Sequence, residues 1–255
     1  MSTTDHRVVS REQWLKERLE LLAAEKSFTR QRDALAQKAR ELPWVRVEKD
    51  YAFDAPTGRK RLADLFGPRR QLVVYHFMFD PTWSQGCMGC SFMADHYDRL
   101  VVHLAHRDIS LVTISRASVE QIEAFRRRMG WTFPWVSDPT AEFGRDFAVS
   151  FTDEEITGGN AVYNFNRKPG PIREQPGLSV FIRHDDGNIY NTYSTFARGL
   201  EEFITAYRFI DITPKGRDED RDGGMNWVRH HDRYDDTNFI VPWAEKPGIT
   251  APLPR

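Results

Sequence analysis

A long helix with a narrow apolar stripe is the first pattern along the chain. No glycine or proline interrupts residues 10–41, and Ser10 followed three residues later by Gln13 matches a helix capping box. Apolar side chains then recur every seven residues, at Trp14, Leu21, Phe28, Leu35 and Leu42. Because such a stripe needs a covering surface, either the domain of the same chain or a second copy must lie against it. We expect an N-terminal helical arm over residues 10–42 and, as a hypothesis, a homodimer formed through it.

After Pro43, strand and helix patterns alternate. A run at 72–79 that is apolar on both faces predicts a strand in the middle of a covered sheet, and 109–115 predicts a second buried strand. Helical spacing follows at 90–104 and 118–129, a third helix is expected from Asp138 to about residue 148, and a hairpin centred on 185–188 precedes a last helix near 200–207. This order is that of a thioredoxin-like α/β sandwich. We assign residues 43–210 to that domain and residues 211–255 to a charged, Gly- and Pro-rich C-terminal tail.

Composition and charge narrow the classes of partner. Among 255 residues, 36 Lys and Arg stand against 37 Asp and Glu, a formal net charge of -1, so no overall positive field favours nucleic acid. No apolar run approaches the roughly 18–20 residues that span a bilayer, and the first ten residues lack the apolar core of a secretory signal. We therefore expect a cytoplasmic protein with neither a nucleic-acid nor a membrane partner.

The only two cysteines form the sequence Cys87-Met88-Gly89-Cys90, directly between the predicted central strand and the helix that follows it. A helix N-terminus carries partial positive charge, which stabilises a thiolate and lowers the pKa of a cysteine placed there. We predict that Cys87 is the nucleophile of a thiol–disulfide oxidoreductase and that Cys90, one turn along, attacks the mixed disulfide and releases the product. Three further residues are weaker candidates for lining the site: His76, Trp83 and Trp131.

Three alternatives use the same residues. Two thiolates with a histidine could bind copper(I), so a copper-binding protein or copper enzyme could use Cys87 and Cys90 with His184, His230 or His231. A thiol peroxidase and a non-catalytic thioredoxin-like interaction module are the other two. For the oxidoreductase no cofactor is required: the partners are a thiol or disulfide substrate and an external reductant, since no dinucleotide-binding motif is present. The tail is either solvated or a cover over the cysteine site.

Longer stretches of the chain resemble known families. The segment 133–139 with 142–144, and the later segments 179–182 and 186–189, are similar to alkyl hydroperoxide reductase type peroxiredoxins. More closely, 71–91, 26–45 and 227–232 together resemble the thioredoxin-like family labelled domain of unknown function 899. The resemblance runs from about residue 11 to 235 and implies a thioredoxin-like fold and dithiol–disulfide oxidoreductase activity. The peroxiredoxin pattern Pro-x-x-x-Thr/Ser-x-x-Cys is not reproduced, because Pro81 lies six residues before Cys87.

Overall fold

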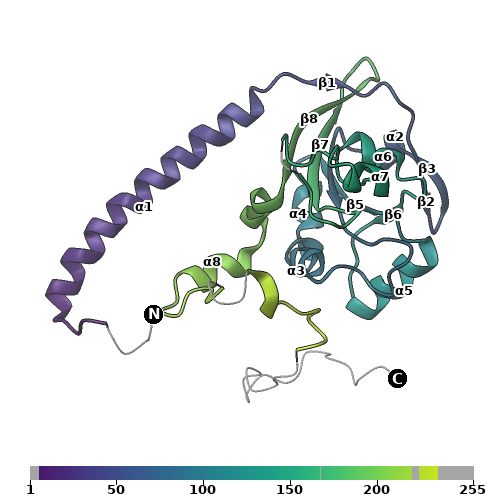
Figure 1. The fold of residues 1–255 in the computed structure, drawn as a ribbon. Coiled ribbons are helices and arrows are strands. Elements are labelled where there is room, and N and C mark those ends of the chain that lie inside the picture. Colours follow the sequence, from purple (N-terminus) through teal and green to yellow (C-terminus); the bar gives the residue numbers. More distant parts are fainter. Residues whose placement is uncertain (1–5, 167, 220–223, 235–255) are drawn as a thin grey trace.

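The fold is organised around one eight-stranded mixed sheet with helices on both faces, seen in a computed structural model that describes residues 6–166, 168–219 and 224–234 (Figure 1). The strands are β1 (Val45–Arg46), β2 (Ala52–Ala55), β3 (Gly58–Arg61), β4 (Gln71–His76), β5 (Ile109–Ser115), β6 (Trp135–Ser137), β7 (Gly177–Arg183) and β8 (Ile189–Phe196). The helices are α1 (Arg11–Arg40), α2 (Leu62–Leu65), α3 (Met88–Tyr97), α4 (Val101–Ala105), α5 (Val119–Met129), α6 (Glu142–Asp146), α7 (Asp153–Thr157) and α8 (Thr205–Asp211), with short 3-10 turns η1 (Asp98–Leu100), η2 (Ala197–Phe203) and η3 (Met225–Trp227).

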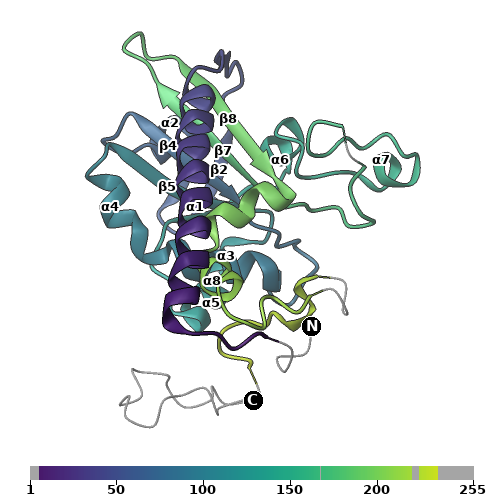
Figure 2. The ribbon, with the colours of Figure 1, turned by 90° about the vertical axis from the view of Figure 1, so that its left-hand side faces the viewer.

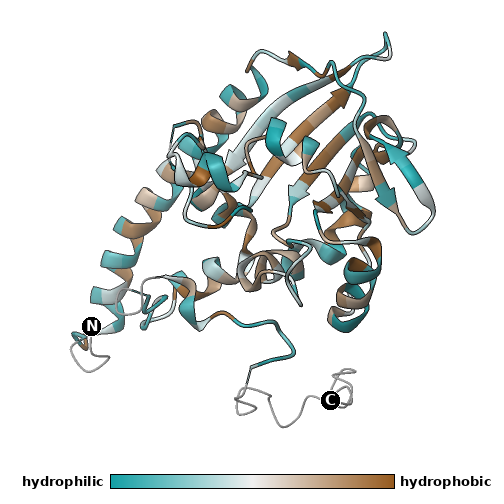
Figure 3. Ribbon diagram, turned by 45° about the vertical axis from the view of Figure 1, so that its right-hand side comes forward, coloured by the Kyte–Doolittle hydropathy of each residue, from teal (hydrophilic) through white to brown (hydrophobic). Residues whose placement is uncertain are grey.

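The strand order in the sheet is β1-β8-β7-β4-β5-β6-β2-β3. β4 and β5 run parallel at its centre, β6 runs parallel to β5, and β7 is antiparallel to both β4 and β8. These central strands carry the apolar runs noted in the sequence (Figure 3). Strand β4, helix α3, strand β5 and helix α5, followed by the β7–β8 hairpin and α8, confirm the predicted thioredoxin-like sandwich.

Alternation along β4 decides which side chains meet the cysteines. Tyr75 and Phe77 lie in the core cluster that also holds Cys90 and the buried faces of α3 and α5. Leu72 and Val74 point to the opposite cluster, which α2 and α6 cover. Because successive strand residues face opposite sides of a sheet, the cysteine pair shares a face with odd-numbered residues of β4.

Short-range hydrogen bonds cap α1 and α5, and the cap predicted at Ser10 is confirmed. Ser10 Oγ accepts a hydrogen bond of 3.1 Å from the Gln13 N–H at the start of α1. Ser118 and Gln121 form the reciprocal box that begins α5, and Gly130 ends that helix in the left-handed region at φ 66°. These short-range signals were sufficient because each depends on residues only three or four apart.

The predicted start of the third helix, at Asp138, was wrong. Asp138 does not cap a helix; its backbone N–H continues the sheet by donating to the Ser115 carbonyl at 2.8 Å. Helix α6 begins four residues later than expected, and the Asp138 carboxylate accepts the Gly144 N–H at 3.0 Å within it. The sheet therefore retains Asp138, and the chain must turn before a helix can form.

Helix α1 stands apart from the sheet in Figure 1, and it lies in front of the domain in Figure 2, which is viewed from the side of this helix. None of its residues is buried, so the apolar stripe is not covered by the domain of the same chain within the described residues. Trp14, Phe28 and Leu35 are 44%, 54% and 66% exposed. The apolar stripe could lie against the domain of the same chain or against a second copy, and the first of these is not observed among the described residues. None of the described helices combines the length and apolar character needed to cross a bilayer.

Candidate redox site

The loop from the end of β4 to α3 holds the first cysteine against the sheet. The Asp80 carboxylate accepts the Thr82 N–H at 2.9 Å, and the Cys87 N–H donates to the Met78 carbonyl at 3.1 Å. Gly86 passes so close to the core that a Cβ there would lie 2.6 Å from the Phe77 ring. Position 86 therefore requires a glycine, because the backbone there passes too close to the Phe77 ring to leave room for a side chain.

Cys87 is half-buried and caps the N-terminus of α3. A hydrogen bond from the Cys90 thiol is the largest cause that lowers the pKa of Cys87, to about 7, against the opposing effect of burial. The N–H groups of Gly89 and Cys90 also lower this pKa, although the sulfur makes no capping hydrogen bond of normal geometry. The N–H groups of the first turn of α3 and the partner thiol therefore lower the Cys87 pKa together, and the partner thiol is the larger cause.

Cys90 has a different environment one turn along. It is 2% exposed, and burial raises the pKa of its thiol well above the ordinary value. The Met78 N–H donates to its sulfur at 3.4 Å. The nearby Tyr75 hydroxyl partly offsets the rise in the Cys90 pKa. Both cysteines are free thiols, so the structure is that of the reduced pair.

The described tail residues 224–234 pack across this site. Val228 is 1% exposed and belongs to the same core cluster as Cys90. A Cβ on Gly89 would lie 3.5 Å from the Met225 methyl and 3.9 Å from Cys87 Sγ, which places Met225 beside the first cysteine. Of the two alternatives for the tail, this part is a cover and not a solvated segment.

Two adjacent histidines attach the cover to the domain. His230, 2% exposed, binds the Gly86 carbonyl through Nε2 at 2.9 Å, while its Nδ1 lies 3.2 Å from the Arg128 guanidinium. Since arginine can only donate, Nδ1 accepts and Nε2 carries the proton. Burial lowers the pKa of His230, which is therefore neutral near pH 7. His231 Nδ1 instead lies 2.7 Å from Asp95, whose hydrogen bond raises the pKa of His231.

The predicted lining residues fall in different places. Trp131 is buried, contributes to the core cluster around Cys90, and donates its indole N–H to Asp95 at 2.7 Å. Trp83 packs partly buried against the same cluster. His76 is not brought to the cysteines: it lies on the other face of β4, stacks on Phe143, and hydrogen-bonds Ser179 at 2.9 Å. The strand alternation explains this separation.

The histidines proposed as copper ligands do not gather around the thiols. His184 lies in the β7–β8 turn, 3.6 Å from Asp186 and next to the Trp44 ring. His230 and His231 bind Gly86 and Asp95 as described. In the part of the chain that the structure describes, no three His, Cys, Asp or Glu side chains form a group that could hold a metal. Within residues 6–166, 168–219 and 224–234, no third protein ligand therefore joins the cysteine pair.

Four residues at the site were not predicted from the sequence: Tyr75, Asp95, Arg128 and Met225. Strand alternation means that either the odd-numbered or the even-numbered residues of β4 share a face with the cysteines. The sequence alone does not say which of the two sets it is. Arg128 is one of three consecutive arginines in the last turn of α5, and no local signal separates it from Arg127. Its partners Asp232 and His230 lie more than 100 residues away in sequence.

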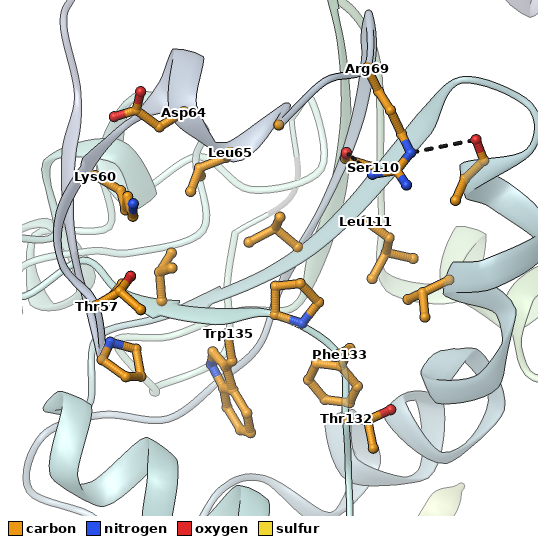
Figure 4. A pocket seen from close by; sticks show the side chains of 18 of the residues that line it. Thr57, Lys60, Asp64, Leu65, Arg69, Ser110, Leu111, Thr132, Phe133 and Trp135 are labelled. Carbon is orange, nitrogen blue, oxygen red and sulfur yellow. Dashed lines mark hydrogen bonds between the residues drawn. The ribbon is translucent and has the colours of Figure 1, made fainter.

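The larger cavities lie elsewhere. A cavity of about 580 Å³ opens between β5, α4 and the β2–β3 hairpin, lined by residues that include Leu65, Leu111 and Trp135 (Figure 4). A smaller polar cavity of about 220 Å³ lies against Arg116 and Arg173. Neither cysteine lines either of them. These two cavities are therefore separate from the cysteine site.

Comparisons with known proteins identify one family and several similar solved structures. A family model described as "Bacterial protein of unknown function (DUF899)" matches residues 3–234, which confirms the resemblance noted in the sequence. Among solved structures, a cysteine-to-serine mutant of Xylella fastidiosa PrxQ is 17% identical, covering 65% of this chain and 94% of that one, at a TM-score of 0.43. The Mycobacterium tuberculosis peroxidoxin BcpB is 17% identical, covering 66% and 97%, at a TM-score of 0.42. No curated protein matches the sequence, and none of these similarities transfers an activity to this chain.

Proposed function

This chain belongs to the bacterial family of unknown function DUF899, and from that premise and the geometry of the cysteine pair we propose that it is a thiol–disulfide oxidoreductase. Cys87 supplies the attacking thiolate, and Cys90 supplies the thiol that releases the product. Trp83 and Trp131 line the site.

The observation that carries this proposal is the contrast between the two thiols. One is half-buried with a pKa of about 7, and the other is buried with a raised pKa, although they lie in the same helical turn and share a hydrogen bond. A nucleophile needs thiolate character and access, whereas a resolving thiol needs only to reach the first sulfur. Inert packing would place no such demand on the pair.

The chemistry needs only thiols. The Cys87 thiolate attacks a substrate disulfide, forms a mixed disulfide, and expels one substrate thiolate. Cys90 then attacks Cys87, which forms the Cys87–Cys90 disulfide and releases the second half of the substrate as a thiol. The pair is oxidised as the substrate is reduced, and an external thiol reductant restores the dithiol. No metal or organic cofactor takes part in this scheme, which suits the reducing cytoplasm.

Glutathione disulfide tests the proposal on the full chain. Reduced protein should convert to the Cys87–Cys90 disulfide, and both halves of glutathione disulfide should be recovered as thiol. Attack by Cys87 releases the first half, and attack by Cys90 on the mixed disulfide releases the second. Alkylation followed by mass spectrometry measures the protein disulfide, and a thiol assay measures the product. Rapid thiol loss with hydrogen peroxide but none with glutathione disulfide would indicate a thiol peroxidase instead. Inertness toward both would leave the interaction module.

We also propose that α1 pairs with α1 of a second copy. Its stripe repeats every seven residues, which is the spacing of helix–helix pairing, and runs along a helix about 45 Å long. The full chain should therefore be a dimer by light scattering, and a chain starting at Pro43 should be a monomer that keeps its thiol reactivity. A full-length monomer at tens of micromolar would contradict the pairing.

A further inference from the structure

Strand β5 has a neighbouring strand on both sides along only part of its length. β4 runs beside nearly all of it, whereas β6 pairs only with its last three residues. Before β6 the chain makes other bonds, because the Asp98 carboxylate accepts the N–H groups of Thr132 at 2.6 Å and Phe133 at 3.2 Å. Pro134, the next residue, has no N–H to donate. Residues 109–112 of β5 therefore have an open edge in the middle of the sheet.

The backbone groups at this open edge are those of the odd-numbered residues. β4 bonds the even-numbered residues of β5, as the Phe77 N–H does by donating to the Ile114 carbonyl at 2.9 Å. Odd-numbered residues face the other way, and the Thr113 N–H donates toward β6. The N–H and C=O groups of Ile109 and Leu111 therefore face the open edge, and no hydrogen bond to them is found in the part of the chain that the structure describes. Since Leu111 is 9% exposed and buried backbone groups are nearly always paired, a further strand would complete this edge.

The cavity of about 580 Å³ lies along this edge, between β5, α4 and the β2–β3 hairpin (Figure 4). On the α4 side its lining is apolar and includes Val101, Leu111 and Phe133. On the α2 side it is lined by Leu65 and Val112, which belong to the other core cluster. Successive side chains of a strand placed in the cavity would alternate between these two sides.

Two half-buried cations lie on the α2 side of the cavity. Lys60 shares a face of the β2–β3 hairpin with its cross-strand partner Phe53, a member of the cluster that α2 covers. Arg69 makes two long hydrogen bonds, of 3.5 Å to the Ala105 carbonyl and 3.4 Å to the Ser110 hydroxyl. Among the described residues, neither cation forms an ion pair with a carboxylate, although neighbouring cations do.

The carboxylates that line the same cavity already have partners. The Asp64 carboxylate accepts the Arg61 N–H at 2.8 Å at the start of α2. Glu123 holds the Arg126 guanidinium through two hydrogen bonds, of 2.9 and 2.8 Å. An acidic side chain that enters the cavity can therefore pair with the two half-buried cations without displacing a carboxylate of the chain.

We propose that the cavity binds an extended peptide as an added strand beside β5, with apolar side chains toward α4 and acidic side chains toward Lys60 and Arg69. The N–H groups of Ile109 and Leu111 donate to peptide carbonyls, and their carbonyls accept peptide N–H groups. In such strand addition the main chain supplies affinity and alternate side chains supply specificity. Neither cysteine lines the cavity, so this site does not depend on the proposed oxidoreductase function.

Fluorescence anisotropy on the full chain tests the predicted peptide chemistry. The probe is a labelled peptide of sequence Val-Glu-Val-Glu-Val with a blocked C-terminus, and its control is Val-Lys-Val-Lys-Val. The glutamate peptide should bind at least tenfold more tightly than the lysine peptide, because opposite charges attract and like charges repel at the two cations. Equal affinities, or no binding of the glutamate peptide at millimolar concentration, would overturn the proposal.

Amide hydrogen exchange measured by NMR tests the strand contact itself. With free glutamate peptide at ten times its dissociation constant, exchange at Ile109 and Leu111 should slow about tenfold, because the bound state protects these N–H groups. Exchange at Ser110 and Val112 should change little, since their N–H groups already bond β4. Unchanged exchange at Ile109 and Leu111 would overturn strand addition. Slow exchange there in the peptide-free protein that increases with protein concentration would assign the edge to a second copy and overturn the peptide as its occupant.

Charge reversal at Lys60 locates the peptide in the cavity. Lys60→Glu should weaken binding of the glutamate peptide about tenfold, whereas Arg59→Glu should change it about twofold or less. Arg59 is the matched control because it is exposed, precedes Lys60 in β3, points to the other face of the hairpin and does not line the cavity. Thermal unfolding verifies that both variants are folded. Equal weakening in the two variants would contradict binding in this cavity and leave the oxidoreductase proposal unaffected.

Discussion

Iodoacetamide should alkylate Cys87 well before Cys90 in the native full-length protein, with a rate that is half-maximal near pH 7. The thiolate is the reactive form of cysteine, so the rate follows the pKa and the access of each thiol. Cys90 is 2% exposed and its pKa is raised by burial, so it should react only at much higher pH or after unfolding. Mass spectrometry of the two alkylated positions across a pH series measures both rates.

Single substitutions of the two cysteines should have different effects on the reaction with glutathione disulfide. Cys87→Ser should abolish reaction with glutathione disulfide, whereas Cys90→Ser should accumulate the mixed disulfide on Cys87, because attack remains and release is lost. Cys90→Ala should raise the pH midpoint of Cys87 alkylation above that of Cys90→Ser. Alanine removes the donor that is the largest cause lowering the Cys87 pKa, while serine retains an O–H group.

Equal labelling of both cysteines with an ordinary thiol pH profile would contradict the assignment of roles. Copper bound by the wild type and lost equally in both serine variants, without any thiol turnover, would favour the metal alternative. Neither outcome would follow from the two environments observed.

Arg128→Ala should expose the site by releasing the C-terminal cover. The Arg128 guanidinium makes two hydrogen bonds to the Asp232 carboxylate, at 2.8 and 2.7 Å, and a third to His230 Nδ1. Asp232 is partly buried, and loss of charge-assisted hydrogen bonds of this kind costs about 1.5–3 kcal/mol. We expect the population of the undocked tail to increase about tenfold or more, and the alkylation rate of Cys87 to increase about fivefold or more.

Arg127→Ala is the matched control for this experiment. Arg127 is exposed on the same last turn of α5, so its loss removes an equal charge near the helix C-terminus without touching the cover. Alkylation rates are compared at one pH, and hydrogen exchange at Val228 and His230 reports release of the tail directly. An equal increase in both variants, or freer exchange of the tail without faster alkylation, would show that the cover does not limit access to Cys87.

The position of the cysteine pair was predictable because its signals are local. An apolar run followed by a Cys-x-x-Cys segment and a helical pattern spans about twenty residues, and the structure places that pair between β4 and α3 as expected. The caps at Ser10 and Ser118 and the stop at Gly130 were predictable for the same reason. Each depends on hydrogen bonds between residues three to five positions apart, so composition at fixed offsets suffices.

The surroundings of the pair depended on contacts that no local pattern specifies. Strand alternation separates Tyr75 from His76, but only the packing of α3 against one face of the sheet decides that Tyr75 shares the core cluster of Cys90. The sequence offered His76 only as a weaker candidate for lining the site, and the fold buries it on the opposite face of β4, where it hydrogen-bonds Ser179.

The C-terminal tail also depends on contacts between residues far apart in the sequence, which the sequence alone did not specify. Trp227, His230 and His231 indicated that part of the tail could dock, whereas its charged, Gly- and Pro-rich composition favoured solvation. The bond between His230 and the Gly86 carbonyl joins residues 144 positions apart. By itself the sequence determined the order of strands and helices and the place of the two thiols, because local backbone hydrogen bonding and side-chain periodicity encode them. Only the tertiary structure decided which groups surround those thiols, because burial and long-range hydrogen bonds exist only after the sheet and its helices have packed.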